Sequence, residues 1–390
     1  MANRQNRNQR SEGILSSNYN LCKFCAQRND VSEKITKEYY SITTLTNKKL
    51  DEISKCFICK GLFEIIDEIV KSLIFHTTIQ NKYEFHSFFL GSSVPTFLFD
   101  NEDHLRSVFK IRGKENIKSA FNNEIKNKFR KILKKSLQPV FPDLMINLSV
   151  QDNFEISIKI KPRSYYLIGR YTKKKFMSQK SMRFIEFERS NSKTRIKHGA
   201  FNPKVSVETI IKKKLIELTA SKDVKFTWMG SEDPNSMVLG KGRFFIAEII
   251  GPQKRRINEN QVFKGDGLIF RIEEKRESIK KYNINYISKI RAYVKTTTPI
   301  DSQKYLTFKQ LNNSIVTYRN KSRMMQKKVY KITAKKLDRY HFVVTFLVDS
   351  GLFIRQFIER KIHVTPTISS QIENDCICIK FDIIGIYPTN

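Results

Sequence analysis

The spacing of apolar and polar residues predicts both helices and strands in the first part of this 390-residue chain. Over residues 115–135 apolar side chains recur at every third or fourth position among Lys and Arg, which is typical of an amphipathic helix. The apolar stripe of this helix consists of Ile117, Phe121, Ile125, Phe129 and Ile132. Residues 144–150 and 154–160 flank a Gln-Asp-Asn turn, and the second run alternates apolar and polar positions. This pattern predicts a β-hairpin with one face in solvent.

Mixed helix and strand patterns continue to the end of the chain. Residues 62–74 and 207–218 have the apolar spacing of helices, whereas 225–229 and 244–250 are typical of strands. Further strand-like runs follow between residues 262 and 348. The last of these leads through Asp-Ser-Gly into a helical run. Together these elements predict an α+β fold, and no internal repeat is found in the sequence.

Composition and charge then narrow the class of partner. Hydrophobic residues make up 40% of the chain, enough for substantial cores. Lys and Arg number 72 against 38 Asp and Glu, a formal net charge of +34. An enzyme that acts on small metabolites has little use for such an excess of positive charge. The same excess attracts polyanions, because their binding releases counterions. Nucleic acid is therefore the expected partner. A general Lys bias of the genome is the alternative reading of the same numbers.

The sequence shows no pattern of a membrane span or of a secretory signal. No run of 18 or more apolar residues occurs, so we expect no membrane span. The opening residues, MANRQNRNQR, lack the apolar segment of a secretory signal. Residues 1–18 are predicted to form a disordered basic tail, and the cytoplasm is the expected location.

Six cysteines occur as three closely spaced pairs. Two Cys-x-x-Cys pairs predict a structural zinc site, because two such turns present four thiolates to a tetrahedral ion. The predicted ligands are Cys22, Cys25, Cys56 and Cys59. Two unrelated reduced pairs are the alternative, and a redox role is less favoured because no thioredoxin-like unit surrounds them. Cys376 and Cys378 alternate along a predicted strand and are expected in the core.

The loop over residues 230–245 places two adjacent carboxylates before a Gly-Lys-Gly-Arg segment. By spacing alone, Asp233 is a turn aspartate before proline. Glu232 and Asp233 are not expected to act as an acid–base pair, because neighbours on an extended chain point to opposite sides. The six histidines fall in no hydrolytic motif, and no glycine-rich loop offers a site for a dinucleotide, methyl donor or triphosphate.

Five segments resemble, in order, blocks of the archaeal and eukaryal tRNA pseudouridine synthases that act at T-loop positions 54 and 55. They are residues 109–125, 168–179, 206–215, 230–255 and 349–358. The resemblance extends from Cys22 to Tyr387. It implies an N-terminal zinc-holding module with a THUMP-type RNA-binding fold over 19–165. A catalytic domain with a mixed, largely antiparallel sheet and a central cleft would follow over 166–390.

The resemblance also implies a reaction and its residues. The family's catalytic Gly-Arg-Glu-Asp loop corresponds to Gly230-Ser231-Glu232-Asp233, which makes Asp233 the expected nucleophile. A strand–turn–helix segment of the family supplies the cation beside it, and the matching residue is Arg355. The expected activity is isomerisation of a flipped uridine to pseudouridine, with structural zinc and no organic cofactor. The expected substrate is tRNA, bound by a monomer. The expected substrate-binding residues are Phe353, Ile354, Arg243, Lys241, Arg170 and Tyr171.

Four positions depart from the family pattern, and one of them is Phe244, which stands where the family's Gly-x-Gly-Arg-Pro-Phe block has Pro. Ser231 stands where the family has Arg, Phe353 where it usually has Tyr, and Ile290 near the place of a base-stacking Tyr. If the register of that strand is shifted, Tyr293 could supply the ring. These departures favour an alternative, a catalytically weakened tRNA-binding protein or chaperone of the same fold. A THUMP-bearing methyltransferase is disfavoured, because the glycine-rich cofactor loop is missing.

Overall fold

The structure is a computed structural model, and its helices and strands fall into two compact units, Met1–Arg163 and Ser164–Asn390. The residues that it describes are 17–31, 35–37, 40–45, 56–181, 205–230, 232–279, 286–320, 323–359 and 363–389. Most of the predicted tail, residues 1–16, lies outside these ranges, and its last two positions belong to strand β1 (Ser17–Cys22). Ser231 is also outside them.

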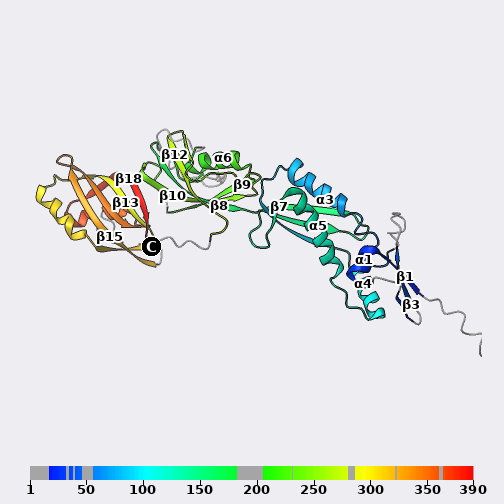
Figure 1. Ribbon diagram of the computed structural model, residues 1–390. Helices are drawn as coiled ribbons and strands as arrows, with labels where there is room; N and C mark the ends of the chain where they lie inside the picture. The colour runs from blue at the N-terminus through cyan, green and yellow to red at the C-terminus, as the bar shows by residue number, and fades with distance from the viewer. Residues whose placement is uncertain are drawn as a thin grey trace, which may run out of the picture. The chain divides into compact units, whose positions relative to one another are not determined.

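The first unit holds two separate sheets (Figure 1). A three-stranded sheet has the order β1-β3-β2, with helix α1 directly after β1, and a four-stranded sheet has the order β5-β4-β6-β7. Helices α3 and α5 pack together, and one continuous apolar core runs through the unit. The remaining elements are β2 (Ile35–Lys37), β3 (Tyr40–Leu45), β4 (Ser87–Ser93), β5 (Ser136–Leu137), β6 (Leu144–Val150), β7 (Ile156–Pro162), α1 (Lys23–Arg28), α3 (Ile66–Ile74), η1 (Phe75–Gln80), α4 (Thr96–Phe109) and α5 (Ile117–Leu133).

Helix α5 forms where the apolar stripe predicted it. Asn116 caps its first turn by accepting a hydrogen bond from the Ser119 backbone N–H at 2.8 Å. Four residues of the predicted stripe are buried, but Ile132 is 58% exposed, and Leu133 packs against the core instead. The helix ends at the left-handed Lys134, before the prolines that follow it. Strands β6 and β7 pair antiparallel, which confirms the predicted hairpin.

The second unit is built on one eleven-stranded sheet. Its order is β11-β12-β8-β10-β18-β13-β16-β15-β14-β17, with β9 paired to β10. All of these pairings are antiparallel except that of β10 with β18. The strands are β8 (Tyr165–Lys173), β9 (Asp223–Trp228), β10 (Val238–Ile250), β11 (Val262–Gly265), β12 (Leu268–Arg276), β13 (Tyr286–Thr296), β14 (Ser314–Asn320), β15 (Arg323–Lys336), β16 (His341–Asp349), β17 (Val364–Thr365) and β18 (Cys376–Pro388). The predicted mixed, largely antiparallel sheet is confirmed.

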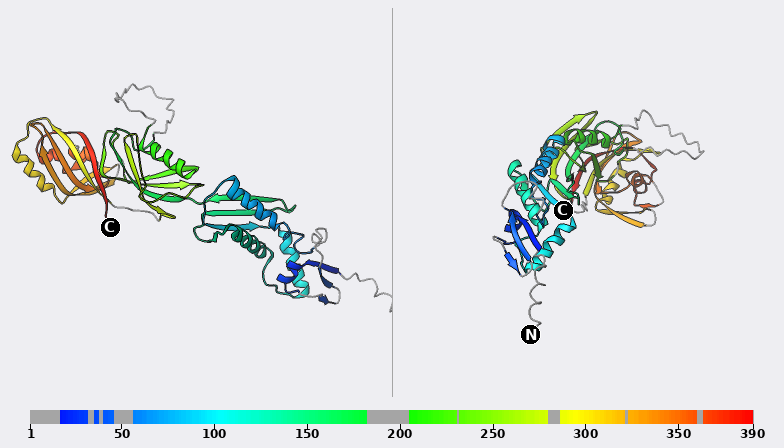
Figure 2. Two further views of the ribbon diagram at one scale, coloured as in Figure 1. Left: turned by 45° about the horizontal axis from the view of Figure 1, so that its top comes forward. Right: turned by 90° about the vertical axis from the view of Figure 1, so that its right-hand side faces the viewer.

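This sheet has two halves with separate cores, joined where β10 meets β18 (Figure 2). At the junction the backbone N–H of Ile383 donates to the Met237 carbonyl at 2.9 Å, and the Met237 N–H donates to the Asp382 carboxylate at 3.1 Å. Helix α6 packs with the first half, and the other helical segments belong to the second. They are α6 (Val207–Thr219), η2 (Ser302–Leu311), α7 (Ile354–Ile358) and α8 (Ile368–Gln371).

Two further sequence predictions can be compared with this unit. Cys376 and Cys378 are buried on the same side of β18, as their alternation predicted. In the parts of the chain that the structure describes, no helix combines the length and the apolar character that a membrane span requires.

Candidate active site

Asp233 lies in the loop that connects β9 to β10. Gly230 enters this loop at a φ of +78°, a conformation that favours glycine. The Asp233 carbonyl accepts the Ser236 N–H at 2.9 Å, and its Oδ1 accepts the Asn235 N–H at 3.0 Å. These bonds form the turn expected of an Asp-Pro pair. They use one carboxylate oxygen and leave Oδ2 for other partners.

Arg355 is the partner of that second oxygen. Its Nε and Nη2 donate to Asp233 Oδ2 at 3.1 and 2.9 Å, across 122 residues of sequence. Its Nη1 donates to the Cys378 carbonyl at 2.8 Å, so the guanidinium is oriented by the backbone of β18. Arg355 belongs to the short helix α7, which follows β16 through the turn at Gly351. The structure therefore brings together the two residues for which catalytic roles were predicted.

The pair opens into a cleft of about 570 Å³. The Asp233 side chain is 22% exposed and that of Arg355 is 40% exposed, so a ligand can reach both. Phe353 borders the cleft and is 43% exposed, with its ring 5.2 Å from that of Tyr318 in an edge-on arrangement. Ile354 also borders it but is mostly buried in the neighbouring core.

Strand β13 settles which of two residues faces this cleft. Ile290 lines it, together with Tyr286 and Ser288 on the same face of the strand. Tyr293 is not among the lining residues, and its ring lies under the ammonium group of Lys380 at 4.5 Å. The apolar Ile290 thus occupies the position near which a stacking tyrosine was expected.

Two predicted substrate-binding residues, Arg243 and Tyr171, are buried. Arg243 is 3% exposed, and its Nε and Nη2 donate to the Met229 carbonyl at 3.1 and 2.7 Å. The Tyr171 hydroxyl donates to a Glu232 carboxylate oxygen at 2.8 Å. Burial, followed by the neighbouring Glu232 charge, holds the pKa of Tyr171 well above its usual value. Both side chains are enclosed beside the loop, although Arg243 also borders the cleft at Asp233 and Tyr171 borders the hollow that contains Lys241. Their predicted contacts with RNA stay predictions.

Lys241 and Arg170 border a different hollow of about 530 Å³, which Arg271 also lines. Lys241 is exposed, and its ammonium lies 5.5 Å from the Tyr387 ring. Arg170 lies over the Phe244 ring and donates to Glu273 at 3.2 Å and to the Ile386 carbonyl at 3.1 Å. These cations are therefore separate from the pair at Asp233.

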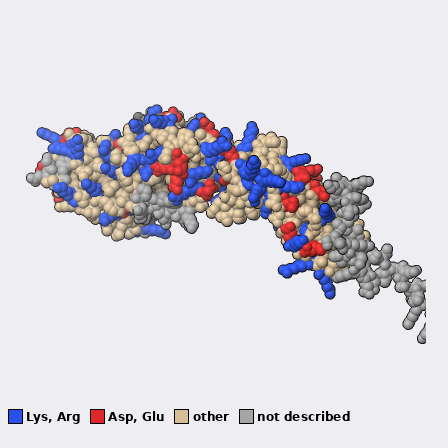
Figure 3. Space-filling model, viewed as in Figure 1, with Lys and Arg blue, Asp and Glu red and all other residues tan. Residues whose placement is uncertain are grey.

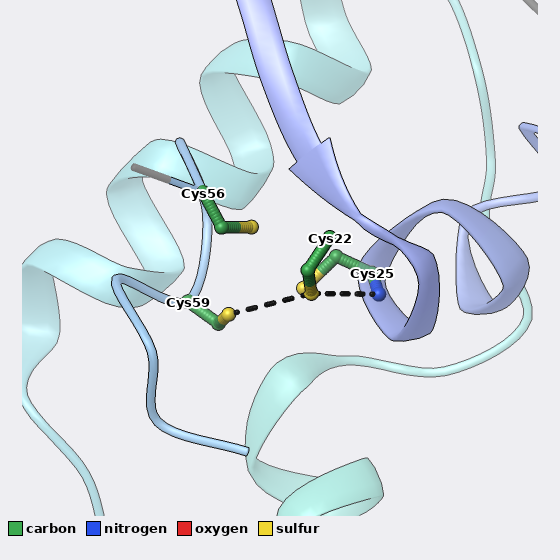
Figure 4. A group of neighbouring side chains, drawn as sticks. All are labelled: Cys22, Cys25, Cys56 and Cys59. Carbon is green, nitrogen blue, oxygen red and sulfur yellow. Dashed lines mark hydrogen bonds between the residues drawn. The ribbon is translucent and has the colours of Figure 1, made fainter. Parts of the chain in front are cut away.

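Four cysteine thiols of the first unit form a buried cluster (Figure 4). Their sulfur atoms all lie within 4.8 Å of one another, and the Cys22 and Cys59 sulfurs are 3.7 Å apart. The Cys25 N–H donates to Cys22 Sγ at 3.4 Å, which resembles the turn geometry of zinc-binding Cys-x-x-Cys pairs. The four predicted ligands, which include Cys56, thus form a group that could hold a metal such as zinc.

Sequence reasoning missed part of the surroundings of Asp233. Glu232 and Lys173 form a buried ion pair at 2.9 Å, and Asp382 binds the far end of the loop at Met237. Lys173 begins a run of three lysines that has no distinguishing pattern. The only available signal was the adjacency of Glu232 to Asp233, which does not reveal its partners.

Comparisons with known proteins identify the family. The family model described as "Pus10, C-terminal" matches residues 166–387, and the "Pus10 THUMP domain, archaeal" model matches residues 77–149. The expected THUMP domain is thereby confirmed over residues 77–149, and the predicted bounds of 19–165 stay a prediction.

Curated relatives give the same result. The tRNA pseudouridine synthase Pus10 of Nitrosopumilus maritimus is 29% identical over 381 residues, which cover 93% of this chain and 94% of that protein. Its namesake from Methanocaldococcus jannaschii is 26% identical over 358 residues, covering 87% of this chain and 77% of the relative.

Among solved structures, a Cbf5-Nop10-Gar1 complex matches at 12% identity with a TM-score of 0.28, over 44% of this chain and 42% of that chain. This likeness is too weak to support an argument. The family-model match spans more than half of the chain, and it confirms the expected enzyme class, an isomerase. The chain belongs to the Pus10 family of pseudouridine synthases.

Proposed function

We propose that this protein isomerises uridine to pseudouridine in the T loop of tRNA, at position 54, position 55 or both. The observation that carries the proposal is the contact of Arg355 with Asp233 at 2.9 Å inside a cleft of about 570 Å³. Its support also includes the relatives in the Pus10 family, which are named tRNA pseudouridine synthases. Asp233 is the proposed nucleophile.

The reaction needs one ionised carboxylate beside an extruded nucleotide. The C1′–N1 bond breaks, the base turns, and a C1′–C5 bond forms, while the C5 proton leaves and N1 gains one. Substrate and product are isomers, so the reaction requires no oxidant or organic cofactor. Asp233 attacks the nucleotide or assists proton abstraction at the sugar, and it is regenerated at the end. Two nitrogens of Arg355 donate to Asp233 Oδ2, and this contact fixes the orientation of the carboxylate.

The cleft and the hollow of Lys241 and Arg170 supply the remaining contacts. We propose that the exposed Phe353 ring packs against the flipped base, with Ile354 forming the wall behind it. Lys and Arg side chains are spread over the visible face of the molecule (Figure 3), so charge alone does not locate the RNA. Lys241 and Arg170 are proposed to contact phosphates, since both border a surface hollow.

The region over residues 19–165 is proposed to dock the body of the tRNA, and 166–390 to carry out catalysis. Zinc bound by the four cysteines would hold the chain around α1 in its folded form, because structural sites of this kind contribute to folding directly. The ion would take no part in the reaction. We propose that the protein works as a monomer in the cytoplasm.

An unmodified tRNA transcript provides the direct test. Purified protein should convert a T-loop uridine, and base-resolution mapping should place the product at 54 or 55. Asp233→Asn, which keeps the shape of the side chain, should abolish conversion while tRNA affinity changes by less than about threefold. Unchanged uridines at both positions would refute the proposed activity.

Ile290 favours a second candidate, a tRNA-binding protein or chaperone with weakened catalysis. An aliphatic side chain lines the cleft near the place of the expected stacking tyrosine, so a flipped base would lack that ring contact. This candidate predicts tight, salt-sensitive tRNA binding without conversion, even when the protein is stoichiometric with tRNA. Ile290→Tyr would then be expected to raise conversion.

A further inference from the structure

The residue next to Asp233 is enclosed in a charged cluster. The side chains of Glu232 and Lys173 are both 0% exposed, and Lys173 Nζ lies 2.9 Å from Glu232 Oε1. Arg243 Nη1 and the Tyr171 hydroxyl donate to the other oxygen, Oε2, at 3.3 and 2.8 Å. Glu232 therefore has two cations and one hydroxyl as partners, with both carboxylate oxygens in contact.

Each partner of Glu232 belongs to the first half of the sheet and is held by a further bond. Lys173 ends β8 and donates to the Met177 carbonyl at 2.6 Å. Tyr171 lies on the same strand and accepts a hydrogen bond from Gln179 Nε2 at 3.1 Å. Arg243 comes from β10 and also donates to the Met229 carbonyl, just before the loop. The cluster therefore fixes Glu232 to two paired strands.

Moving the loop away from this cluster would cost free energy. Removing one member of a buried ion pair leaves its partner charged and desolvated, which disfavours any conformation in which Glu232 leaves. Consecutive Cα atoms are about 3.8 Å apart, so holding Glu232 restricts Asp233 to a small region. The far end of the loop is held on the second half of the sheet, where Asp382 accepts the Met237 N–H. Arg355 approaches from that same half.

We propose that Glu232 is a positioning residue for the reaction, which it serves by anchoring the loop so that Asp233 Oδ2 meets Arg355 and the target nucleotide. The inference rests on the proposed function for its effect on turnover. The anchoring itself is a property of the loop that can be measured without any activity.

Two variants separate positioning from folding. Glu232→Gln leaves Lys173 and Arg243 buried without their counter-charge. Glu232→Gln combined with Lys173→Met removes one charge of each sign, so the net charge of the cluster returns to its wild-type value while Arg243 keeps its bonds to the Met229 carbonyl. We expect the double variant to recover most of the melting temperature that the single variant loses. In both variants, single-turnover conversion of saturating tRNA should fall by about 10- to 100-fold, because a displacement of about 1 Å has effects of this size. The tRNA dissociation constant should stay within about twofold.

Amide hydrogen exchange over residues 230–238 reports the anchoring directly. The N–H groups of Asn235, Ser236 and Met237 are bonded within the loop or to Asp382, and their exchange should accelerate at least tenfold in both variants. Glu102→Gln is the matched control, since Glu102 is a buried glutamate with two arginine partners in the first unit. It should lower the melting temperature but leave exchange over 230–238 unchanged.

The outcomes distinguish this inference from the proposed function. Unchanged loop exchange in Glu232→Gln overturns the inference whether or not the protein modifies tRNA. Turnover that recovers together with melting temperature in the double variant also overturns it, because the role of Glu232 would then be structural. If the wild-type protein converts no uridine while loop exchange responds as expected, the anchoring stands and the proposed function fails.

Discussion

Replacing Arg355 by Met should separate the catalytic role of this residue from its contribution to stability. The substitution keeps an unbranched side chain but removes both contacts with Asp233 Oδ2 and the bond to the Cys378 carbonyl. The Asp233–Arg355 pair is 22% and 40% exposed, so solvent screens its contribution to folding. Pairs of this kind contribute under about 1 kcal/mol. The additional hydrogen bond to Cys378 contributes about 0.5–1.5 kcal/mol.

The expected cost in unfolding free energy is therefore about 1–2 kcal/mol. For a unit of this size each kcal/mol lowers the melting temperature by about 2–4 °C. Turnover should fall much further. Removing one preorganised donor from a reacting centre typically costs about 100- to 1000-fold in rate. Arg355→Met should thus lose activity out of proportion to its loss of stability.

Single-turnover conversion of saturating tRNA, measured beside thermal unfolding and tRNA affinity, is the appropriate assay. Arg355→Lys serves as the matched variant. It keeps the charge, but one ammonium group cannot reproduce the planar contact with Asp233 and the bond to Cys378 together, so an intermediate rate is expected. The reasoning is refuted if Arg355→Met converts tRNA within about threefold of the wild-type rate. It is also refuted if the loss of rate follows only from unfolding at the assay temperature.

Three further results are expected. Denaturing the protein should release about one zinc ion per chain. Cys56→Ser should abolish this release, whereas Cys376→Ser should preserve it. A metal-free protein that folds as stably as the zinc-bound protein would contradict the assignment of the four cysteines to a structural zinc site. Gly230→Ala should destabilise the protein by about 1–3 kcal/mol, because φ at this position is +78° and the added Cβ would lie 2.3 Å from the Tyr286 hydroxyl. Gly265→Ala is the control: its added Cβ meets open space, so the melting temperature should hardly change. Burial raises the pKa of Cys378 to about 11, so little of this thiol is ionised at pH 8. In the folded, metal-bound protein, iodoacetamide should therefore modify Cys378 about tenfold faster for each pH unit between 8 and 10. A rate of modification that does not change with pH would show that access alone limits the reaction.

Local patterns were sufficient for several parts of this molecule. The stripe over residues 117–129 produces α5 because side chains at helical spacing share one face, and most of that face is buried. The alternation over residues 154–160 predicted a strand for the corresponding reason, and β7 (Ile156–Pro162) forms there and pairs with β6. Two Cys-x-x-Cys pairs carry their own geometry, since a short turn brings both thiols of a pair together before any long-range folding.

The prediction of Asp233 and Arg355 as a catalytic pair depended on family resemblance, because no spacing rule links residues that far apart. That they contact each other is a result of the sheet. The loop between β9 and β10 belongs to one half, α7 follows β16 in the other, and the β10–β18 junction brings them together. The catalytic roles themselves stay predictions.

The types of element, the four cysteines that could hold a metal and the family could all be predicted from the sequence, because each depends on local spacing or on ordered motifs. The sequence did not determine which polar side chains would be enclosed. Arg243 and Tyr171 have the sequence character of RNA-contacting residues, yet both lie inside with Glu232. Burial depends on which strands and loops cover a side chain, and those neighbours come from distant segments. Whether a cation is exposed at the surface or enclosed beside the loop that carries Asp233 is therefore visible only in the folded chain.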